Sequence, residues 1–237
     1  NGAVASNKVE VTANSFPKAT LAGGQGMSLQ ARDWSQPSFM DEVLEDRIEA
    51  YGEKVNEEVT NGAGTSGPPQ KVTGITVAQT DRINAGGADT AARAIAFVAS
   101  VAEAKGDVYG GSKRWPGVAF ANGDTLAIIE GWTDSDGRPL LATDGASNAI
   151  GTLDGPSPAG RIRGLTVYAD DSVGANLMIV SSFRDAKLWE SKSSPIQVGL
   201  TYPDVLTVDV AVYGYLAVAI RRPAAFAIVE RIGIAAA

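Results

Sequence analysis

Residues 205–220 read VLTVDVAVYGYLAVAI and alternate between apolar and other side chains along almost their whole length. One face of this stretch carries Leu206, Val208, Val210, Val212, Leu216, Val218 and Ile220, with Gly214 in the same register. Period-two alternation is the signature of a strand with one buried face. The strand would be far longer than the usual five or six residues, so we expect a bend near Gly214.

Residues 36–60 carry the clearest helical pattern. Their apolar side chains recur with a 3.6-residue period at Met40, Val43, Leu44, Ile48, Tyr51, Val55 and Val59. Ser35 is a suitable N-cap, Pro37 fits the first turn, and Gly62 marks the end. A helix of this length spans roughly 36 Å, which is typical of a structural strut.

The remaining elements mix helices and strands without regular alternation. We predict helices at about 88–105, ending at Gly106, and at 124–132, with strands at 118–120, 161–168, 177–182, 187–190 and 225–230. The face proposed for the first of these helices comprises Ala91, Ile95, Val98 and Ala102. Residues 1–34 read as extended and loop-rich, because Gly23, Gly24 and Gly26 break regular structure. The class is therefore α+β.

The composition excludes several catalytic chemistries. The 237 residues contain neither His nor Cys, which removes His-based triads, thiolate nucleophiles, disulfides and zinc–thiolate sites. The longest apolar stretch near a chain end, residues 211–220, is half the roughly 20 residues that span a bilayer. The first ten residues show no signal-peptide pattern.

The negative charge is concentrated in the predicted helix. Eight acids and two bases lie between Asp41 and Glu58, a net charge of −6 out of −7 for the whole chain. Because phosphate binding requires the opposite sign, specific nucleic-acid recognition is not expected.

Three motif matches are better explained structurally. Residues 62–67 match G-x-G-x-x-G, but a helix precedes them and Pro68 and Pro69 follow, so they indicate a helix end and a linker. Ser15 and Lys18 match S-x-x-K, but Pro17 prevents the helical turn that would join them. Residues 134–137, Asp-Ser-Asp-Gly, lack the later ligands of a calcium loop and indicate a turn.

Small basic clusters and isolated tryptophans suggest contacts rather than a binding platform. The clusters are Lys113-Arg114, Arg161 with Arg163, and Arg221-Arg222, and the tryptophans are Trp34, Trp115, Trp132 and Trp189. We interpret the bases as salt-bridge donors in turns or interfaces, and the tryptophans as core or interface anchors. We assign no catalytic, cofactor-binding or metal-binding residue and no cofactor.

The order of several segments carries a family resemblance. QARDWSQP at 30–37 leads into the acidic helix, which ends in NGAGTSG at 61–67. WTDSDGRPL at 132–140, GRIRGLTV at 160–167 and YLAVAIRRPAAF at 215–226 follow. This ordered set resembles the major capsid proteins of tailed bacteriophages, whose Hong Kong-type fold is shared with encapsulin shells.

The resemblance implies a domain organisation. Residues 1–34 would form the returning limb of an extended loop that reaches over a neighbouring subunit. Residues 35–66 and 188–222 would form a peripheral domain with a spine helix and a long strand. Residues 67–187 and 223–237 would form an axial domain, which meets its copies at pentamer and hexamer centres.

The implied function is a structural one. The chain would be a non-enzymatic subunit of the icosahedral capsid of a tailed phage or prophage. Its partners would be copies of itself and enclosed double-stranded DNA, bound without sequence-specific contacts, with no membrane or small-molecule substrate. The implied location is the virion capsid, assembled in the bacterial host cytoplasm.

Further expectations follow from the resemblance. The spine helix would lie towards the shell interior, where its charge would keep DNA from the wall. We find no counterpart of the family's N-terminal arm or outgoing loop limb, so the chain is expected to be a trimmed piece. Lys8 or Lys18 would be the lysine of a Lys–Asn cross-link, but no Asn follows Asn176, so no such cross-link is expected.

Two alternatives stay open at the level of sequence. One is an encapsulin shell that encloses protein cargo, which the contents of the particle would distinguish. The other is a carboxylate-dependent hydrolase, which requires a concave pocket with two acids of perturbed pKa.

Overall fold

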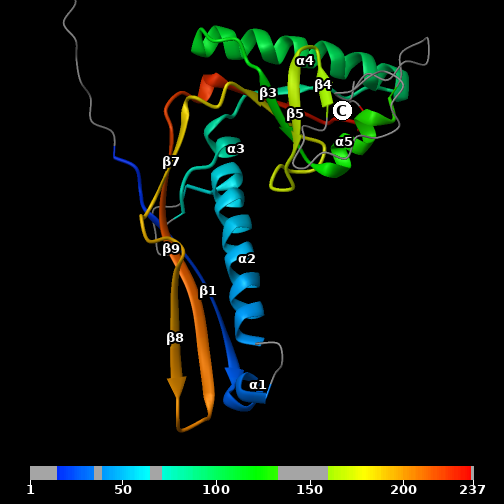
Figure 1. The fold of residues 1–237 in the computed structure, drawn as a ribbon. Coiled ribbons are helices and arrows are strands. Elements are labelled where there is room, and N and C mark those ends of the chain that lie inside the picture. Colours follow the sequence, from blue (N-terminus) through cyan, green and yellow to red (C-terminus); the bar gives the residue numbers. More distant parts are fainter. Residues whose placement is uncertain (1–14, 35–38, 65–70, 133–159, 236–237) are drawn as a thin grey trace, which may run out of the picture.

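The computed structural model describes residues 15–34, 39–64, 71–132 and 160–235. The molecule consists of a long arm and a broader head that sits on one end of the arm (Figure 1). The arm pairs a long helix with a four-stranded sheet, and the head packs two helices with a six-stranded sheet. This mixture of separate helices and strands confirms the α+β class. Within the described residues, no helix is both long and apolar enough to cross a membrane.

A single long strand organises the sheet of the arm. The arm contains β1 (Ala19–Ser28), β7 (Ala186–Glu190), β8 (Ile196–Tyr202) and β9 (Thr207–Ile220), with α1 (Leu29–Trp34), α2 (Phe39–Asn61) and α3 (Ile75–Ala78). β9 pairs with β1 along one edge and with β8 and then β7 along the other, always antiparallel. The predicted alternation is confirmed from Val208 to Val218, since Val208, Val210, Val212, Leu216 and Val218 are all buried. Leu206, predicted for the same face, lies before the strand and is 58% exposed.

The expectation that glycines interrupt the region before Ser28 is wrong. β1 runs through Gly23, Gly24 and Gly26 and keeps its register with β9 over all ten residues. Glycine weakens a strand on its own, but here the partner strand supplies the backbone hydrogen bonds. At Gly26 an added Cβ would lie 2.7 Å from Oδ1 of Asp209, an exposed side chain that would have to turn aside.

Helix α2 lies along the sheet of the arm. Val43 and Tyr51 are buried against it, and Leu44, Val55 and Val59 are partly buried. Ile48, predicted for the same face, is 39% exposed. The helix ends at Asn61, and a Cβ at Gly62 would lie 2.3 Å from the Val72 carbonyl oxygen. The predicted cap residues, Ser35 and Pro37, lie outside the described residues.

Gly214 gives α2 room to approach the centre of β9. A Cβ at this position would lie 2.1 Å from the hydroxyl oxygen of Tyr51. Strand pairing continues through Gly214, which is opposite Leu21 of β1. The glycine therefore accommodates an aromatic side chain, and β9 stays paired with β1 on both sides of it.

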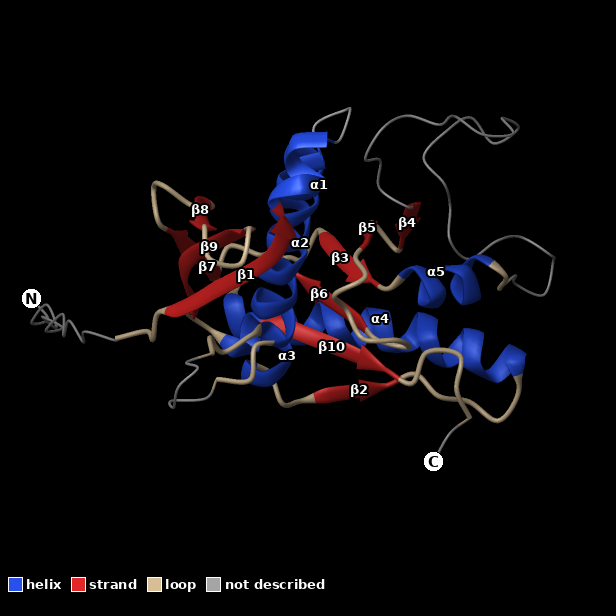
Figure 2. Cartoon of the chain, turned by 90° about the horizontal axis from the view of Figure 1, so that it is seen from below, coloured by secondary structure: helices blue, strands red, loops and turns tan. Residues whose placement is uncertain are grey.

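The head is built around a mixed sheet. It contains β2 (Arg82–Asn84), β3 (Val118–Ala121), β4 (Gly160–Ile162), β5 (Leu165–Ala169), β6 (Met178–Ser181) and β10 (Phe226–Glu230), with α4 (Thr90–Ser112), α5 (Gly123–Glu130) and a 3-10 turn, η1 (Pro223–Ala225). The strand order is β2-β10-β6-β3-β5-β4. The β2–β10 and β3–β5 pairs are parallel and the others antiparallel. Figure 2 shows α4 lying along this sheet, where Phe97 packs on Trp132 with ring centres 5.4 Å apart.

The predicted buried face of α4 is wrong. The residues that face the core are Ala94, Phe97, Val101, Ala104 and Val108, whereas Ile95 is 72% exposed. Small and β-branched residues surround much of this helix, so two apolar stripes compete and only the sheet selects one. The helix also continues past Gly106 to Ser112, and ends where Lys113 adopts a left-handed conformation.

The remaining strand predictions, in the head and in the arm, are largely confirmed, with three differences. Residues 161–168 form a hairpin of β4 and β5, because Arg163 and Gly164 both have positive φ and turn the chain. β8 of the arm was not predicted, since residues 196–202 lie exposed on the sheet and carry only a weak apolar pattern. β2 of the head was not predicted either, because its three residues are too few to show a period. The strands at β3, β6, β7 and β10 and the helix α5 lie where the sequence placed them.

Candidate subunit interfaces

A buried carboxylate fastens the arm to the head. Asp185 precedes β7, and its side chain is only 5% exposed. Its Oδ2 lies 3.3 Å from Arg114 Nη1 at the end of α4, and its Oδ1 lies 3.9 Å from Arg222 Nε after β9. Its carbonyl accepts a hydrogen bond from the backbone N–H of Arg221 at 2.8 Å. One acid thus joins three segments that are far apart in the sequence.

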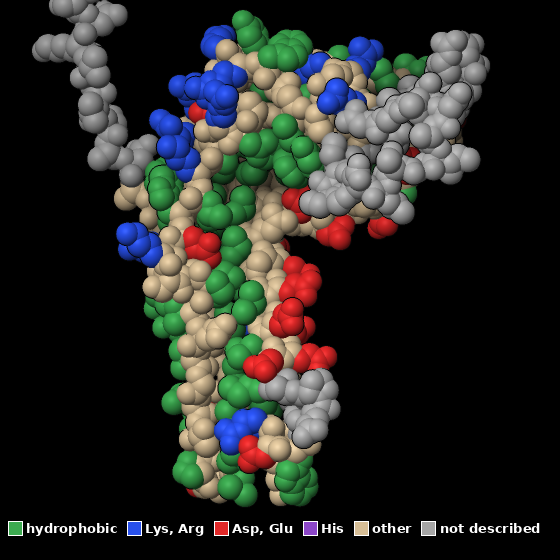
Figure 3. All heavy atoms as spheres, in the orientation of Figure 1, with side chains coloured by type: hydrophobic (Ala, Val, Ile, Leu, Met, Phe, Trp, Pro, Cys, Tyr) green, Lys and Arg blue, Asp and Glu red, His purple; other side chains and the backbone are tan. Residues whose placement is uncertain are grey.

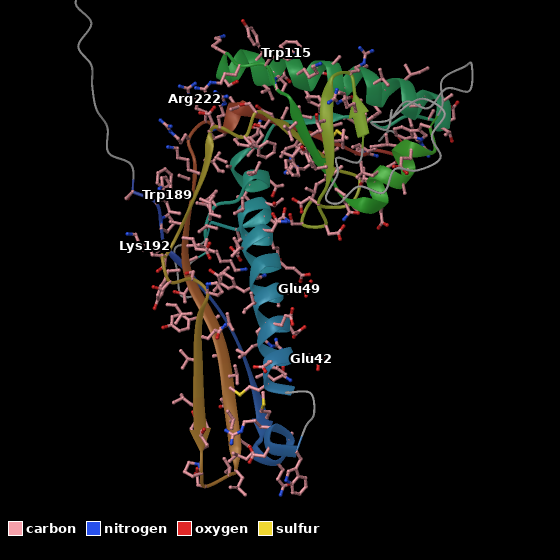
Figure 4. All side chains as sticks on the ribbon, in the orientation of Figure 1. Glu42, Glu49, Trp115, Trp189, Lys192 and Arg222 are labelled. Carbon is pink, nitrogen blue, oxygen red and sulfur yellow. The ribbon has the colours of Figure 1, made fainter. Side chains whose placement is uncertain are left out.

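The same junction gathers an excess of positive charge. We call the six exposed bases around Asp185 the basic patch: Lys113, Arg114, Arg184, Lys187, Arg221 and Arg222. The tertiary structure here unites two clusters that were separate in the sequence, one after α4 and one after β9. Figure 3 shows Lys and Arg side chains gathered beside the junction, where Figure 4 labels Arg222.

The outer side of α2 carries the opposite charge. We call its seven exposed acids the acidic face: Asp41, Glu42, Glu45, Asp46, Glu49, Glu53 and Glu57. The eighth acid of the segment, Glu58, is buried instead. Arg47 pairs with Asp46 at 3.6 Å, and Lys54 pairs with Glu57. Glu42 and Glu49 point away from the sheet of the arm (Figure 4).

A tyrosine links α2 to β7 inside the arm. The hydroxyl of Tyr51 donates a hydrogen bond to Glu190 Oε1 at 2.6 Å. Burial, reinforced by this bond to a carboxylate, raises the pKa of Tyr51 to about 12. The tyrosine is therefore a neutral donor that holds the helix against the sheet at physiological pH.

Large apolar side chains lie exposed on the arm. Trp189 and Tyr215, with Lys18 and Glu190, line an open groove of about 490 Å³ on the sheet. Farther along, Val198, Leu200, Tyr202, Val205, Leu206 and Trp34 are exposed, Trp34 to 79%. A monomeric protein rarely exposes so many large apolar residues in one region, so this surface of the arm indicates contacts with other chains.

The tryptophans divide into one buried and three exposed side chains. Trp132 is buried in the core of the head. Trp34, Trp115 and Trp189 are at least half exposed. Lys105 Nζ lies 5.0 Å from the ring centre of Trp115, which also contacts Tyr109 edge-on. These exposed rings are available as contact residues, as expected of interface anchors.

The motif matches gain no chemical support from the structure. Ser15 and Lys18 lie in an exposed extended segment before β1. The G-x-G-x-x-G match begins at the end of α2, but its last three residues and the Asp134–Gly137 turn lie outside the described residues. In the basic cluster of Arg161 and Arg163, the backbone carbonyl of Arg163 accepts a hydrogen bond from Lys105 Nζ. Among the described residues, no group of three or more acids could hold a metal ion.

The sequence matches the model of the phage capsid family over residues 3–230. A comparison with curated proteins found no match.

Solved structures of similar fold share little sequence identity with the chain. It resembles a chain from Gordonia phage Cozz with a TM-score of 0.64 and 14% identity, covering 100% of this chain and 79% of that one. The capsid of an empty GTA particle gives a TM-score of 0.65 and 17% identity, covering 100% and 81%. The SrpI encapsulin complex from Synechococcus elongatus PCC 7942 gives a TM-score of 0.64 and 15% identity. The match covers 91% of this chain and 74% of that one.

These findings agree on the type of protein. The family match spans nearly the whole chain, and the arm and head reproduce the fold of capsid and encapsulin shells. The protein is a structural, non-enzymatic subunit of a capsid shell, located in the virion capsid, that associates with copies of itself. The chain belongs to the phage capsid family.

Proposed function

We propose that the subunit builds the icosahedral capsid of a tailed bacteriophage or prophage, with pentamers and hexamers as its building units. The observation that carries this proposal is the surface of the arm. The two-layer arm exposes Trp34, Leu200, Leu206 and other large apolar residues, and no other part of the described chain covers them. Neighbouring copies would supply that cover.

The division into functional regions is part of the proposal. The peripheral domain would comprise 35–66 and 188–222, and the axial domain 67–187 and 223–237. The arm and the head, each with its own sheet, support this division. Residues 1–34 would form the returning limb of an extended loop. β1 lies in the C-terminal half of that limb and pairs with β9 over all ten of its residues. That half of the limb therefore packs as part of the arm.

The enclosed cargo would be double-stranded DNA, held without sequence-specific contacts. The net charge of −7 supports this, because a reader of DNA sequence usually presents a continuous positive surface. Assembly would take place in the cytoplasm of the bacterial host before DNA enters.

An encapsulin-type compartment is the second candidate. Its support is the similarity to the SrpI encapsulin complex, at a TM-score close to that of the phage chain. Such a shell would contain protein cargo.

Microscopy of the full-length product of the gene tests both candidates. Negative-stain images should show closed particles of uniform diameter. The ratio of absorbance at 260 and 280 nm, measured before and after nuclease treatment of the opened particles, distinguishes DNA from protein cargo. Soluble monomers at all concentrations would contradict both candidates.

A further inference from the structure

We propose that the basic patch of one subunit binds the acidic face of α2 on the next subunit in the shell. This inference rests on the proposed function and names two surfaces that would join adjacent copies. It replaces the expectation that the acids of this helix face the enclosed DNA. The occupant of each surface is thus a second copy of the same chain.

The two surfaces match in charge. The seven acids of the acidic face, with Arg47 and Lys54, carry a net charge of −5. The six bases of the basic patch, with Asp185, carry +5. Neighbouring surfaces of equal and opposite charge attract each other and select one orientation.

Most of these charges have no ion-pair partner among the described residues. Within the part of the chain that the structure describes, the side chains of Glu42, Glu45, Glu49 and Glu53 form no ion pair. The same holds for Lys113, Arg184, Lys187 and Arg221. Among the described residues, the ion pairs of the two surfaces involve Asp46 and Glu57 on the acidic face, and Arg114 and Arg222 in the patch. Both surfaces therefore keep charges available for a neighbour.

The surfaces lie on opposite sides of the subunit. In Figure 3 the acidic side chains follow one side of the arm, and the basic side chains gather on the other side near the junction. They cannot meet within one chain, but they can meet between two chains placed head to tail. Head-to-tail contacts repeat around a ring when the rotation closes, as a pentamer or hexamer requires.

Rigid elements hold both surfaces. The acidic face lies on a helix of 23 residues that packs along the sheet. The patch is tied down by the buried Asp185 and by a hydrogen bond from Ser181 Oγ to the Ala225 carbonyl at 2.8 Å. Single exposed ion pairs contribute little, but a preformed network of several pairs adds specificity. It also makes assembly sensitive to salt, since the Debye length is about 8 Å at physiological ionic strength.

Charge reversal in the full-length product tests the pairing. The first variant combines Glu45→Lys with Glu49→Lys, and the second combines Arg184→Glu with Arg221→Glu. None of the four side chains is an ion-pair partner of Asp185 in the described structure. Each should raise the protein concentration required for shell assembly by on the order of tenfold or more, measured by light scattering and negative stain. Combining the two variants should restore assembly towards the wild-type concentration.

Two controls accompany these variants. Glu103→Lys with Asp107→Lys makes the same change of charge on exposed positions of α4, and should leave the assembly concentration near that of the wild type. Circular dichroism of each variant establishes that the subunit still folds. Raising the salt concentration should weaken wild-type assembly.

Three other outcomes would contradict either the pairing of the two surfaces or the proposed function. Empty shells that form normally from both reversed variants, with only DNA retention changed, would mean that these charges face DNA. Two defective variants whose combination stays defective would show that the surfaces do not pair with each other. A wild-type product that forms no shell at all would instead contradict the proposed function.

Discussion

Replacing Gly111 with alanine should destabilise the subunit, although alanine normally favours a helix. Gly111 lies in the last turn of α4, where the helix crosses η1. An added Cβ would lie 1.9 Å from the Ala224 carbonyl oxygen, 2.5 Å from its carbon and 2.7 Å from its Cβ. Two of these atoms belong to the backbone, so no side-chain rotation relieves the overlap.

The expected magnitude follows from two opposing effects. Alanine in place of glycine within a helix gains about 0.5–1 kcal/mol. Forcing an extra methyl group into a packed contact costs about 1–3 kcal/mol. The net loss at Gly111 should be on the order of 1–2 kcal/mol. Gly106 is the matched control in the same helix, because a Cβ there meets nothing within 4 Å. Gly106→Ala should therefore gain about 0.5–1 kcal/mol.

Urea unfolding of unassembled subunits, followed by circular dichroism, measures both variants. The protein concentration must be low and identical throughout, because association with other copies adds apparent stability. The midpoint should fall for Gly111→Ala and rise for Gly106→Ala. A midpoint for Gly111→Ala at or above that of the wild type would show that η1 does not hold the close contact described.

Three further substitutions test other parts of the structure. Tyr51→Phe removes the hydrogen bond to Glu190 and should lose about 1 kcal/mol at pH 7. Because the folded pKa of Tyr51 is raised to about 12 from a usual value near 10, its contribution is complete below pH 10 and is lost between pH 10 and 12. The wild-type advantage in urea midpoint over Tyr51→Phe should shrink across that interval, and an advantage that grows would refute the assignment. Phe97→Ala should lose about 3–5 kcal/mol of unfolding free energy, because the side chain is fully buried. Ile95→Ala, on the exposed side of α4, should change it by less than about 0.5 kcal/mol. Equal losses in the two variants would contradict the observed buried face of α4. Asp185→Ala should lose about 1.5 kcal/mol of unfolding free energy. This value is at the low end for a hydrogen bond to a charged group, because both arginine partners are half exposed. An unchanged thermal midpoint would argue against the role of Asp185 at the junction.

Elements whose pattern is local and strong could be predicted from the sequence. The alternation around Val208 and Val218 is confirmed in β9, and the stripe through Val43 and Tyr51 is confirmed in α2. In both cases one face is clearly more apolar than the other, so burial has a single solution. In α4 the apolar residues surround the helix, and periodicity alone predicted the wrong buried face, since Ile95 is exposed.

The candidate interfaces were predicted only in part. The concentration of acids in α2 is visible in the sequence because these residues are close along the chain. The basic patch is not visible, because it joins the segments around Arg114, Arg184 and Arg221, which the chain order separates widely.

The sequence by itself determined the α+β class, the long strand, the acidic helix and the absence of histidine and cysteine chemistry. Only the tertiary structure decided that β1 pairs through its glycines, which face of α4 is buried, and that Asp185 gathers bases at the junction. The physical reason is that periodicity and composition act between near neighbours in the chain. Strand partners, close backbone contacts and ion pairs depend on segments that only folding brings together.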